Sequence, residues 1–167
     1  ICWSRPRIGG SGRRWSWVSG ATARPGPCCC SRNASRPDGA PPPDYKFFVF
    51  DGRVELIQVN SGRFGHQTAT FLDADWNRLP VRWRIRPVAD EPRPPELPTM
   101  LEIASALGSG WDFIRIDLYA VDGTVWFGEY TPYPGGGLLR YRPRQFDDEQ
   151  GRHWRLPTLE QVQRGQP

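Results

Sequence analysis

The feature that most constrains the fold is the Asp-Gly dipeptide at residues 122–123. It separates two runs, within residues 113–131, in which β-branched and aromatic residues alternate with polar ones. Asp-Gly between two such runs is the strongest local signal for a β-hairpin, because a tight hairpin turn needs residues that tolerate positive φ. The segment is therefore predicted to be a hairpin with one polar and one apolar face.

The length of the hairpin loop decides which face receives Glu129. On the first strand, Arg115 and Asp117 share one face, opposite the isoleucines. A two-residue loop would pair Asp117 with Gly128 and leave Glu129 on the apolar face, where an unpaired carboxylate is very costly. We therefore predict a three-residue loop over residues 121–123, which pairs Arg115 with Glu129.

Three charged side chains then share the polar face of the hairpin: Arg115, Asp117 and Glu129. They can form a structural ion pair, as most such groups do. They can also bind a divalent cation and a phosphate, because Mg²⁺ takes carboxylate oxygens and arginine offers phosphates a planar set of donors. The pattern alone leaves both interpretations open. The opposite, buried face is predicted to carry Ile114, Ile116, Leu118 and Trp126.

A second Asp-Gly, at residues 51–52, predicts another hairpin earlier in the chain, formed by Tyr45–Phe50 and Arg53–Asn60. Lys46 lies on its first strand, and from the pattern alone it is either an edge-strand lysine or an anion-binding group. Arg63 follows the second strand and is a further candidate for the same anion site.

The remaining patterns predict helices. Thr99 and Glu102 form a capping box at the start of an apolar stripe that ends near Gly108. Two weaker helices are predicted over residues 143–150 and 158–163. Together with the hairpins, they indicate an α+β fold, an antiparallel sheet with helices on one face.

Several spaced motifs resemble those of a known family. Residues 115–117 read Arg-Ile-Asp and residues 129–135 read Glu-Tyr-Thr-Pro-Tyr-Pro-Gly, which resembles the closing motif of ATP-grasp enzymes. With Asp-Tyr-Lys-Phe-Phe at 44–48 and Asp-Ala-Asp-Trp at 73–76, the chain is similar to the TupA-like ATP-grasp branch, named for teichuronopeptide biosynthesis. The resemblance covers residues 38–160 and corresponds to the C-terminal part of such an enzyme.

This resemblance implies a ligase that uses Mg²⁺ and ATP to activate a carboxylate as an acyl phosphate, in the synthesis of cell-surface polysaccharide or another polymer. The implied partners are a nucleotide and a small-molecule or glycan substrate. The implied metal ligands are Asp117, Glu129 and Thr131, with threonine where many ATP-grasp enzymes have asparagine. The implied catalytic residues are Lys46 and Arg115, and the implied nucleotide-binding residues are Lys46, Arg63 and Arg115.

The alternative is a truncated or degenerate ATP-grasp module without turnover. No G-x-x-x-x-G-K-[ST] phosphate loop occurs in the sequence. The glycine-rich loop and adenine pocket of ATP-grasp enzymes would precede the part that the motifs cover. We therefore expect this chain to be an incomplete enzyme that binds ATP weakly or not at all by itself.

Composition divides the chain into residues 1–36 and residues 37–167. Residues 1–43 hold seven arginines and one aspartate (+6), whereas residues 44–167 hold 15 basic and 17 acidic residues (−2). The first segment has no helical or strand periodicity and is predicted to be disordered, or translated out of frame. A nucleic-acid-binding role would rest on this segment alone, and we expect none for the folded part.

All four cysteines also lie before residue 31, so none can crosslink the predicted sheet. No run is apolar and long enough for a signal sequence or a membrane span, which favours a cytoplasmic protein. Nothing in the sequence predicts an oligomeric state.

Overall fold

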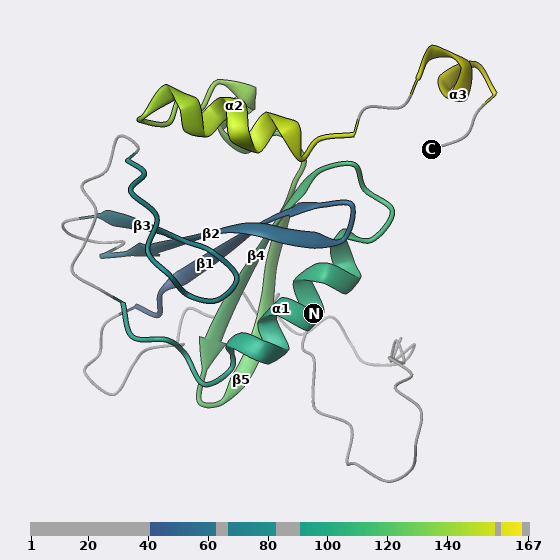
Figure 1. Cartoon of the computed structure of the whole chain (residues 1–167). Helices are drawn as coiled ribbons and strands as arrows, with labels where there is room; N and C mark the ends of the chain where they lie inside the picture. Colours follow the sequence, from purple (N-terminus) through teal and green to yellow (C-terminus); the bar gives the residue numbers. More distant parts are fainter. Residues whose placement is uncertain (1–40, 63–66, 83–90, 156–157, 165–167) are drawn as a thin grey trace, which may run out of the picture.

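The structure, a computed structural model, describes residues 41–62, 67–82, 91–155 and 158–164 (Figure 1). Both the predicted disordered segment 1–36 and Arg63 fall outside these residues. The described chain forms a five-stranded sheet in the order β3-β2-β1-β4-β5. The strands are β1 (Asp44–Phe50), β2 (Arg53–Ser61), β3 (Thr68–Leu72), β4 (Ile114–Val121) and β5 (Thr124–Thr131). The helices are α1 (Leu97–Gly108), α2 (Arg144–Arg152), α3 (Leu159–Gln163) and a short 3₁₀ segment, η1 (Pro134–Gly137).

All four strand pairs are antiparallel, which confirms the predicted α+β class with an antiparallel sheet. Helix α1 covers one face, where it packs on a cluster that includes Phe47, Ile57 and Ile116. Helix α2 packs against part of the other face, through Phe146 and Phe48 in a second cluster. The two helices therefore lie on opposite sides of the sheet (Figure 1), so the predicted placement of the helices on one face is wrong. In the described part of the chain, no helix is long and apolar enough to cross a membrane.

Helix α1 begins earlier than the sequence pattern indicated. Its first residue is Leu97, and Glu96 precedes it without a side-chain capping hydrogen bond, so the predicted capping box at Thr99 is wrong. Pro98 lies in the first turn, where proline fits because those N–H groups need no helical partner. The predicted stripe is buried at Met100 and at the residues one turn later.

The loop of the β4–β5 hairpin also differs from the prediction. Val121 pairs with Thr124, so the loop has two residues, Asp122 and Gly123, with φ of +51° and +73°. These are the positive values that a tight hairpin turn requires. The predicted three-residue loop is therefore wrong.

A β-bulge at Gly128 has the effect that we attributed to a longer loop. Leu118 pairs with Phe127, but Asp117 pairs with Glu129, so Gly128 is the extra residue on β5. An extra residue shifts the alternation of side chains by one position. Glu129 therefore lies on the face of Asp117, as predicted, although for a different reason.

The two-residue loop also exchanges the faces predicted for the two aromatic residues that precede the bulge. Trp126 pairs with Tyr119, on the face of the sheet that carries Asp117. Phe127 packs instead against the cluster under α1. The prediction that Trp126 lies on the buried apolar face is wrong, because the two-residue loop places it on the opposite one.

Candidate functional site

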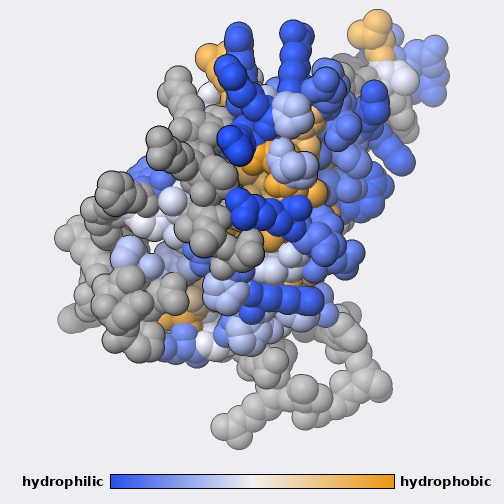
Figure 2. All heavy atoms as spheres, turned by 60° about the vertical axis from the view of Figure 1, so that its left-hand side comes forward, coloured by the Kyte–Doolittle hydropathy of each residue, from blue (hydrophilic) through white to orange (hydrophobic). Residues whose placement is uncertain are grey.

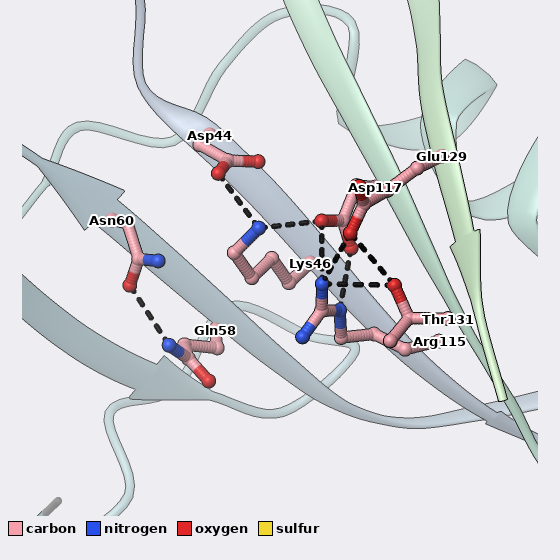
Figure 3. A network of polar contacts seen from close by, with 8 residues as sticks. All are labelled: Asp44, Lys46, Gln58, Asn60, Arg115, Asp117, Glu129 and Thr131. Carbon is pink, nitrogen blue, oxygen red and sulfur yellow. Dashed lines mark hydrogen bonds and ion pairs between the residues drawn. The ribbon is translucent and has the colours of Figure 1, made fainter. Parts of the chain in front are cut away.

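A row of polar side chains crosses four strands on the face opposite α1. In the sheet register, Gln58 lies opposite Lys46, Lys46 opposite Asp117, and Asp117 opposite Glu129. Residues directly opposite each other in an antiparallel pair are within side-chain reach. Strands from both hairpins therefore contribute to one polar row (Figure 3).

Asp117 is the centre of the row and is only 2% exposed. Arg115 donates from Nε to Oδ1 at 2.7 Å and from Nη2 to Oδ2 at 2.8 Å, a bidentate contact. Lys46 donates from Nζ to Oδ2 at 2.5 Å. Two cations thus satisfy both oxygens of a buried carboxylate, which burial otherwise makes costly.

Glu129 and Thr131 extend the network toward solvent. Arg115 Nη2 donates to Glu129 Oε1 at 2.8 Å and to Thr131 Oγ1 at 3.0 Å, and Thr131 donates to Glu129 Oε1 at 2.8 Å. In the register, Arg115 lies opposite Thr131 rather than opposite Glu129 as predicted. The Glu129 side chain is 60% exposed, so it is the accessible carboxylate of the group.

Asp44 is a member of this network that we did not predict as a site residue. Its Oδ2 lies 2.7 Å from Lys46 Nζ. Its Oδ1 is buried and has no hydrogen-bond partner within the described residues. The available signal was the spacing of Asp44 and Lys46, because residues two apart on a strand share a face.

Gln58 and Asn60 are the other polar residues that sequence reasoning missed. Gln58 is 3% exposed and donates from Nε2 to Asn60 Oδ1 at 2.8 Å. A β-bulge at Glu55 decides their face. Val49 pairs with Val54 and Phe48 pairs with Leu56, so Glu55 is the extra residue on β2. Neither residue type nor spacing reveals a bulge at that position.

The two carboxylates of the hairpin differ in their environment. Burial raises the pKa of Asp117, although hydrogen bonds and charge from Arg115 and Lys46 oppose this effect. The hydrogen bond from Thr131, together with the charge of Arg115, lowers the pKa of Glu129. The exposed carboxylate is therefore the one more strongly favoured in its charged form.

The net negative charge of the cluster favours the binding of a cation. Asp44, Asp117 and Glu129 contribute three negative charges, against two positive charges from Lys46 and Arg115, for a net charge of −1. Since the Glu129 side chain is largely exposed, a cation can reach it without crossing the protein interior.

The donor set fits Mg²⁺ when phosphate oxygens complete its coordination. Mg²⁺ prefers oxygen ligands and commonly takes one or two carboxylates together with phosphates. The hydrogen bonds from Arg115 and Thr131 both use Oε1 of Glu129, and the 60% exposure of the side chain makes this carboxylate an accessible oxygen ligand. Among the described residues, no group of three His, Cys, Asp or Glu side chains is arranged to hold a metal ion by itself.

The structure thus brings together five of the six predicted site residues, Lys46, Arg115, Asp117, Glu129 and Thr131. The sixth, Arg63, lies outside the described residues. By contrast, Asp73 of the predicted motif at 73–76 caps its own loop, accepting backbone hydrogen bonds from Asp75 and Asn77.

Comparison with known proteins gives one match. A protein-family model described as TupA-like ATPgrasp matches residues 34–155. The match includes every residue of the polar row and both hairpins. Neither a curated protein nor a solved structure matches the chain.

Proposed function

Because this chain belongs to the TupA-like ATP-grasp family, we propose that it supplies the phosphate- and metal-binding face of a ligase. The ligase uses Mg²⁺-ATP to convert a carboxylate into an acyl phosphate, which an amine or hydroxyl group then attacks. One observation carries the proposal: a single guanidinium, that of Arg115, contacts Asp117, Glu129 and Thr131 at once.

Arg115 is proposed to stabilise charge on the transferring phosphoryl group. Phosphoryl transfer needs little covalent chemistry from the protein, so positioned positive charge contributes most of the catalysis. The carboxylates that bind Arg115 fix the plane of its guanidinium before substrate arrives. Lys46, held between Asp44 and Asp117, is proposed to add a second positive charge on the phosphates.

Glu129, Asp117 and Thr131 are proposed to hold Mg²⁺, with Glu129 as the first contact because it is exposed. Bound there, the metal ion would neutralise phosphate charge and orient the phosphoryl oxygens. Asp117 can contribute an oxygen only by exchanging one of the hydrogen bonds from Arg115 or Lys46. We propose Arg63 as a further nucleotide-binding residue, on the sequence resemblance alone.

We also propose, from the same resemblance, that the reaction belongs to cell-surface polysaccharide or polymer synthesis and uses cytoplasmic ATP. The substrates would be a small molecule or glycan that carries the carboxylate and a second one that carries the amine or hydroxyl group.

A module without turnover is the second candidate. It is favoured by the hydrogen bonds of Asp117, because both of its carboxylate oxygens already accept hydrogen bonds from Arg115 or Lys46. In that case the cluster is a structural ion network that holds β1, β4 and β5 together. The two candidates predict opposite consequences for the same substitution.

The deciding substitution is Glu129→Gln. We expect Mg²⁺-dependent ADP release to fall by about 10²-fold or more, because a charge that acts on the phosphoryl group is lost. The melting temperature should change little, since exposed ion pairs contribute little stability. The matched control is Glu149→Gln, at an exposed position on α2. A lower melting temperature with unchanged Mg²⁺ dependence would identify a structural network instead.

A further inference from the structure

A pocket of about 200 Å³ lies on the same face of the sheet as the polar row. On the sheet side it is lined by Phe48 of β1 and Leu56 of β2. On the opposite side it is lined by Gln150 of α2 and by Trp154, just after the end of that helix. Residues 132–134 and Gly137, after β5, line it as well. In Figure 2, hydrophobic residues are visible between hydrophilic ones in the upper part of the molecule, at the height of α2 in Figure 1.

The pocket adjoins the charged cluster. Phe48, in the pocket wall, lies directly opposite Arg115 in the β1–β4 register. Pro132, also in the wall, follows Thr131 in the chain. Arg115 is thus the residue at which the polar and apolar halves of this sheet face meet. Burial raises the pKa of the Tyr141 hydroxyl group, and Arg115 is near enough to this residue, which lines the pocket, for its charge to oppose the shift.

Two buried polar atoms belong to residues that line the pocket. Tyr141 Oη and Gln150 Oε1 are both inaccessible to solvent and have no hydrogen-bond partner within the described residues. Tyr141 is 9% exposed. A buried donor or acceptor without a partner is costly, so such atoms are normally paired in the functional state. Both residues line the pocket, and a hydroxyl group is the ligand group suited to either atom, since it donates one hydrogen bond and accepts others.

The walls are pre-formed by aromatic contacts. Tyr141 packs edge-on against Phe146 of α2, with ring centroids 5.5 Å apart. Trp154 packs against Phe113 at 4.9 Å and donates from Nε1 to Asp112 Oδ2 at 2.7 Å. These contacts hold α2 over the sheet from both of its ends. A pre-formed pocket loses less free energy on binding than one that must order itself.

We propose that this pocket binds an aromatic ring, or an apolar group of similar size, carried by the carboxylate substrate, with the carboxylate directed to Arg115. The size agrees, because an apolar cavity of about 150 Å³ is enough for benzene. As an assignment of substrate class, the inference rests on the proposed ligase function. Binding to the pocket can nevertheless be measured without ATP.

The test uses three probes with the complete 167-residue chain: p-hydroxyphenylacetate, its neutral amide, and acetate. Equilibrium dialysis without nucleotide should show that p-hydroxyphenylacetate binds. The amide and acetate should each bind at least about tenfold more weakly. The amide loses a charge-assisted hydrogen bond, and acetate has no ring to bury in the pocket. Equal affinity for all three probes would overturn the inference.

Two substitutions on α2 locate the binding. Gln150→Phe places a ring in the pocket, so it should weaken the binding of p-hydroxyphenylacetate by about tenfold or more. It also removes one buried atom without a hydrogen-bond partner, so the melting temperature should not fall. Gln145→Phe, at an exposed position of the same helix outside the pocket, should leave the affinity unchanged. Unchanged binding by Gln150→Phe would overturn the inference.

Two outcomes separate this inference from the proposed function. Glu129→Gln should not lower the affinity for p-hydroxyphenylacetate, because it removes a negative charge that is bound to Arg115, whereas Mg²⁺-dependent ADP release should be lost. If wild type releases ADP but no probe binds, the pocket assignment fails and the proposed ligase function stands. If adenosine binds with the same sensitivity to Gln150→Phe and the acid does not, the pocket is a nucleobase site and the inference is overturned.

Discussion

The two Asp-Gly hairpins have the same local geometry but position different residues. Each has a two-residue loop with positive φ at both positions: +49° and +74° at Asp51 and Gly52, and +51° and +73° at Asp122 and Gly123. Each also has a β-bulge in its returning strand. The local geometry of the two turns is therefore nearly identical.

The bulges differ in residue and in consequence. In β2 the extra residue is Glu55, whose side chain is partly exposed and lies 3.2 Å from Arg53 Nε. In β5 it is Gly128, where an added Cβ would lie 2.8 Å from Tyr119 and 3.0 Å from the carbonyl oxygen of Asp117. The first bulge leaves room for a side chain, whereas the second requires glycine.

The positions of the strands explain what each bulge decides. Strand β2 is interior to the sheet, and its bulge assigns Leu56 and Ile57 to two buried faces. Strand β5 is an edge strand, and its bulge assigns Glu129 to the face of Asp117. One device thus sets the packing of the core in one hairpin and the composition of the polar site in the other.

Substituting alanine at each bulge gives the largest expected difference. Gly128→Ala would place a Cβ 2.8 Å from the Tyr119 side chain and 3.0 Å from the Asp117 carbonyl oxygen, so it should lower the free energy of unfolding by about 3 kcal/mol. Glu55→Ala removes only a partly exposed side chain that pairs with Arg53, so it should cost less than about 1 kcal/mol. Urea denaturation measures the free energy of unfolding of both variants. Equal losses would show that the two bulges do not differ in the room that they leave for a side chain.

The next effect tests the face assignment within β5. Phe127→Ala should lower the free energy of unfolding by about 2 kcal/mol, roughly half the cost for a fully buried phenylalanine, because Phe127 packs on the core but is only half-buried. Trp126→Ala, on the other face, should cost less than about 1 kcal/mol. The reverse order in chemical denaturation would mean that the loop is not the two-residue one in solution.

The turn glycines should give equal and smaller effects. Gly52→Ala and Gly123→Ala each place a Cβ at φ near +74°, at about 1 kcal/mol for the left-handed conformation. At both positions the nearest atoms lie 3.6 Å or further from that Cβ, so no steric clash adds to the cost. Thermal unfolding of the two variants compares them directly. A clear difference would show that tertiary contacts, rather than turn geometry, limit these positions.

The smallest effect is the pH dependence of the two hairpin carboxylates. The lowered pKa of Glu129 contributes stability that is present above its ordinary pKa and lost as pH falls through the folded value. Relative to Glu129→Gln, wild type should therefore gain stability as pH rises, by a few tenths of a kcal/mol, because the exposed side chain is screened by solvent.

Asp117 should show the opposite slope. Its raised pKa means that the folded state binds the proton of Asp117 more tightly than the unfolded state does. Wild type should therefore lose stability relative to Asp117→Asn as pH rises from the ordinary pKa of aspartate to the raised pKa of the folded state. Denaturation between about pH 3 and pH 7 covers both carboxylates. Slopes of the same sign would contradict the assignment of one buried and one exposed carboxylate.

Local sequence determined the positions of the two hairpins and of α1, and five residues of the site. The places of both turns, the antiparallel pairing within each hairpin and the end of the helix near Gly108 follow from dipeptides and periodicity that act over a few residues. Lys46, Arg115, Asp117, Glu129 and Thr131 were identified from spaced motifs, and the structure brings all five together. Alternation along β4 and β5 fixes which of their side chains share a face, whereas the place of Lys46 in the site followed only from the family resemblance.

Tertiary structure decided the register and, with it, the side chains that join the site from other strands. The Gly128 bulge, rather than the loop, places Glu129, and the Glu55 bulge places Gln58. A bulge becomes favourable only when both faces of the sheet have their packing partners, because its cost is local and its gain comes from the whole face. Asp44, Gln58 and the pocket under α2 depend on contacts across at least two strands, which periodicity along one segment cannot encode.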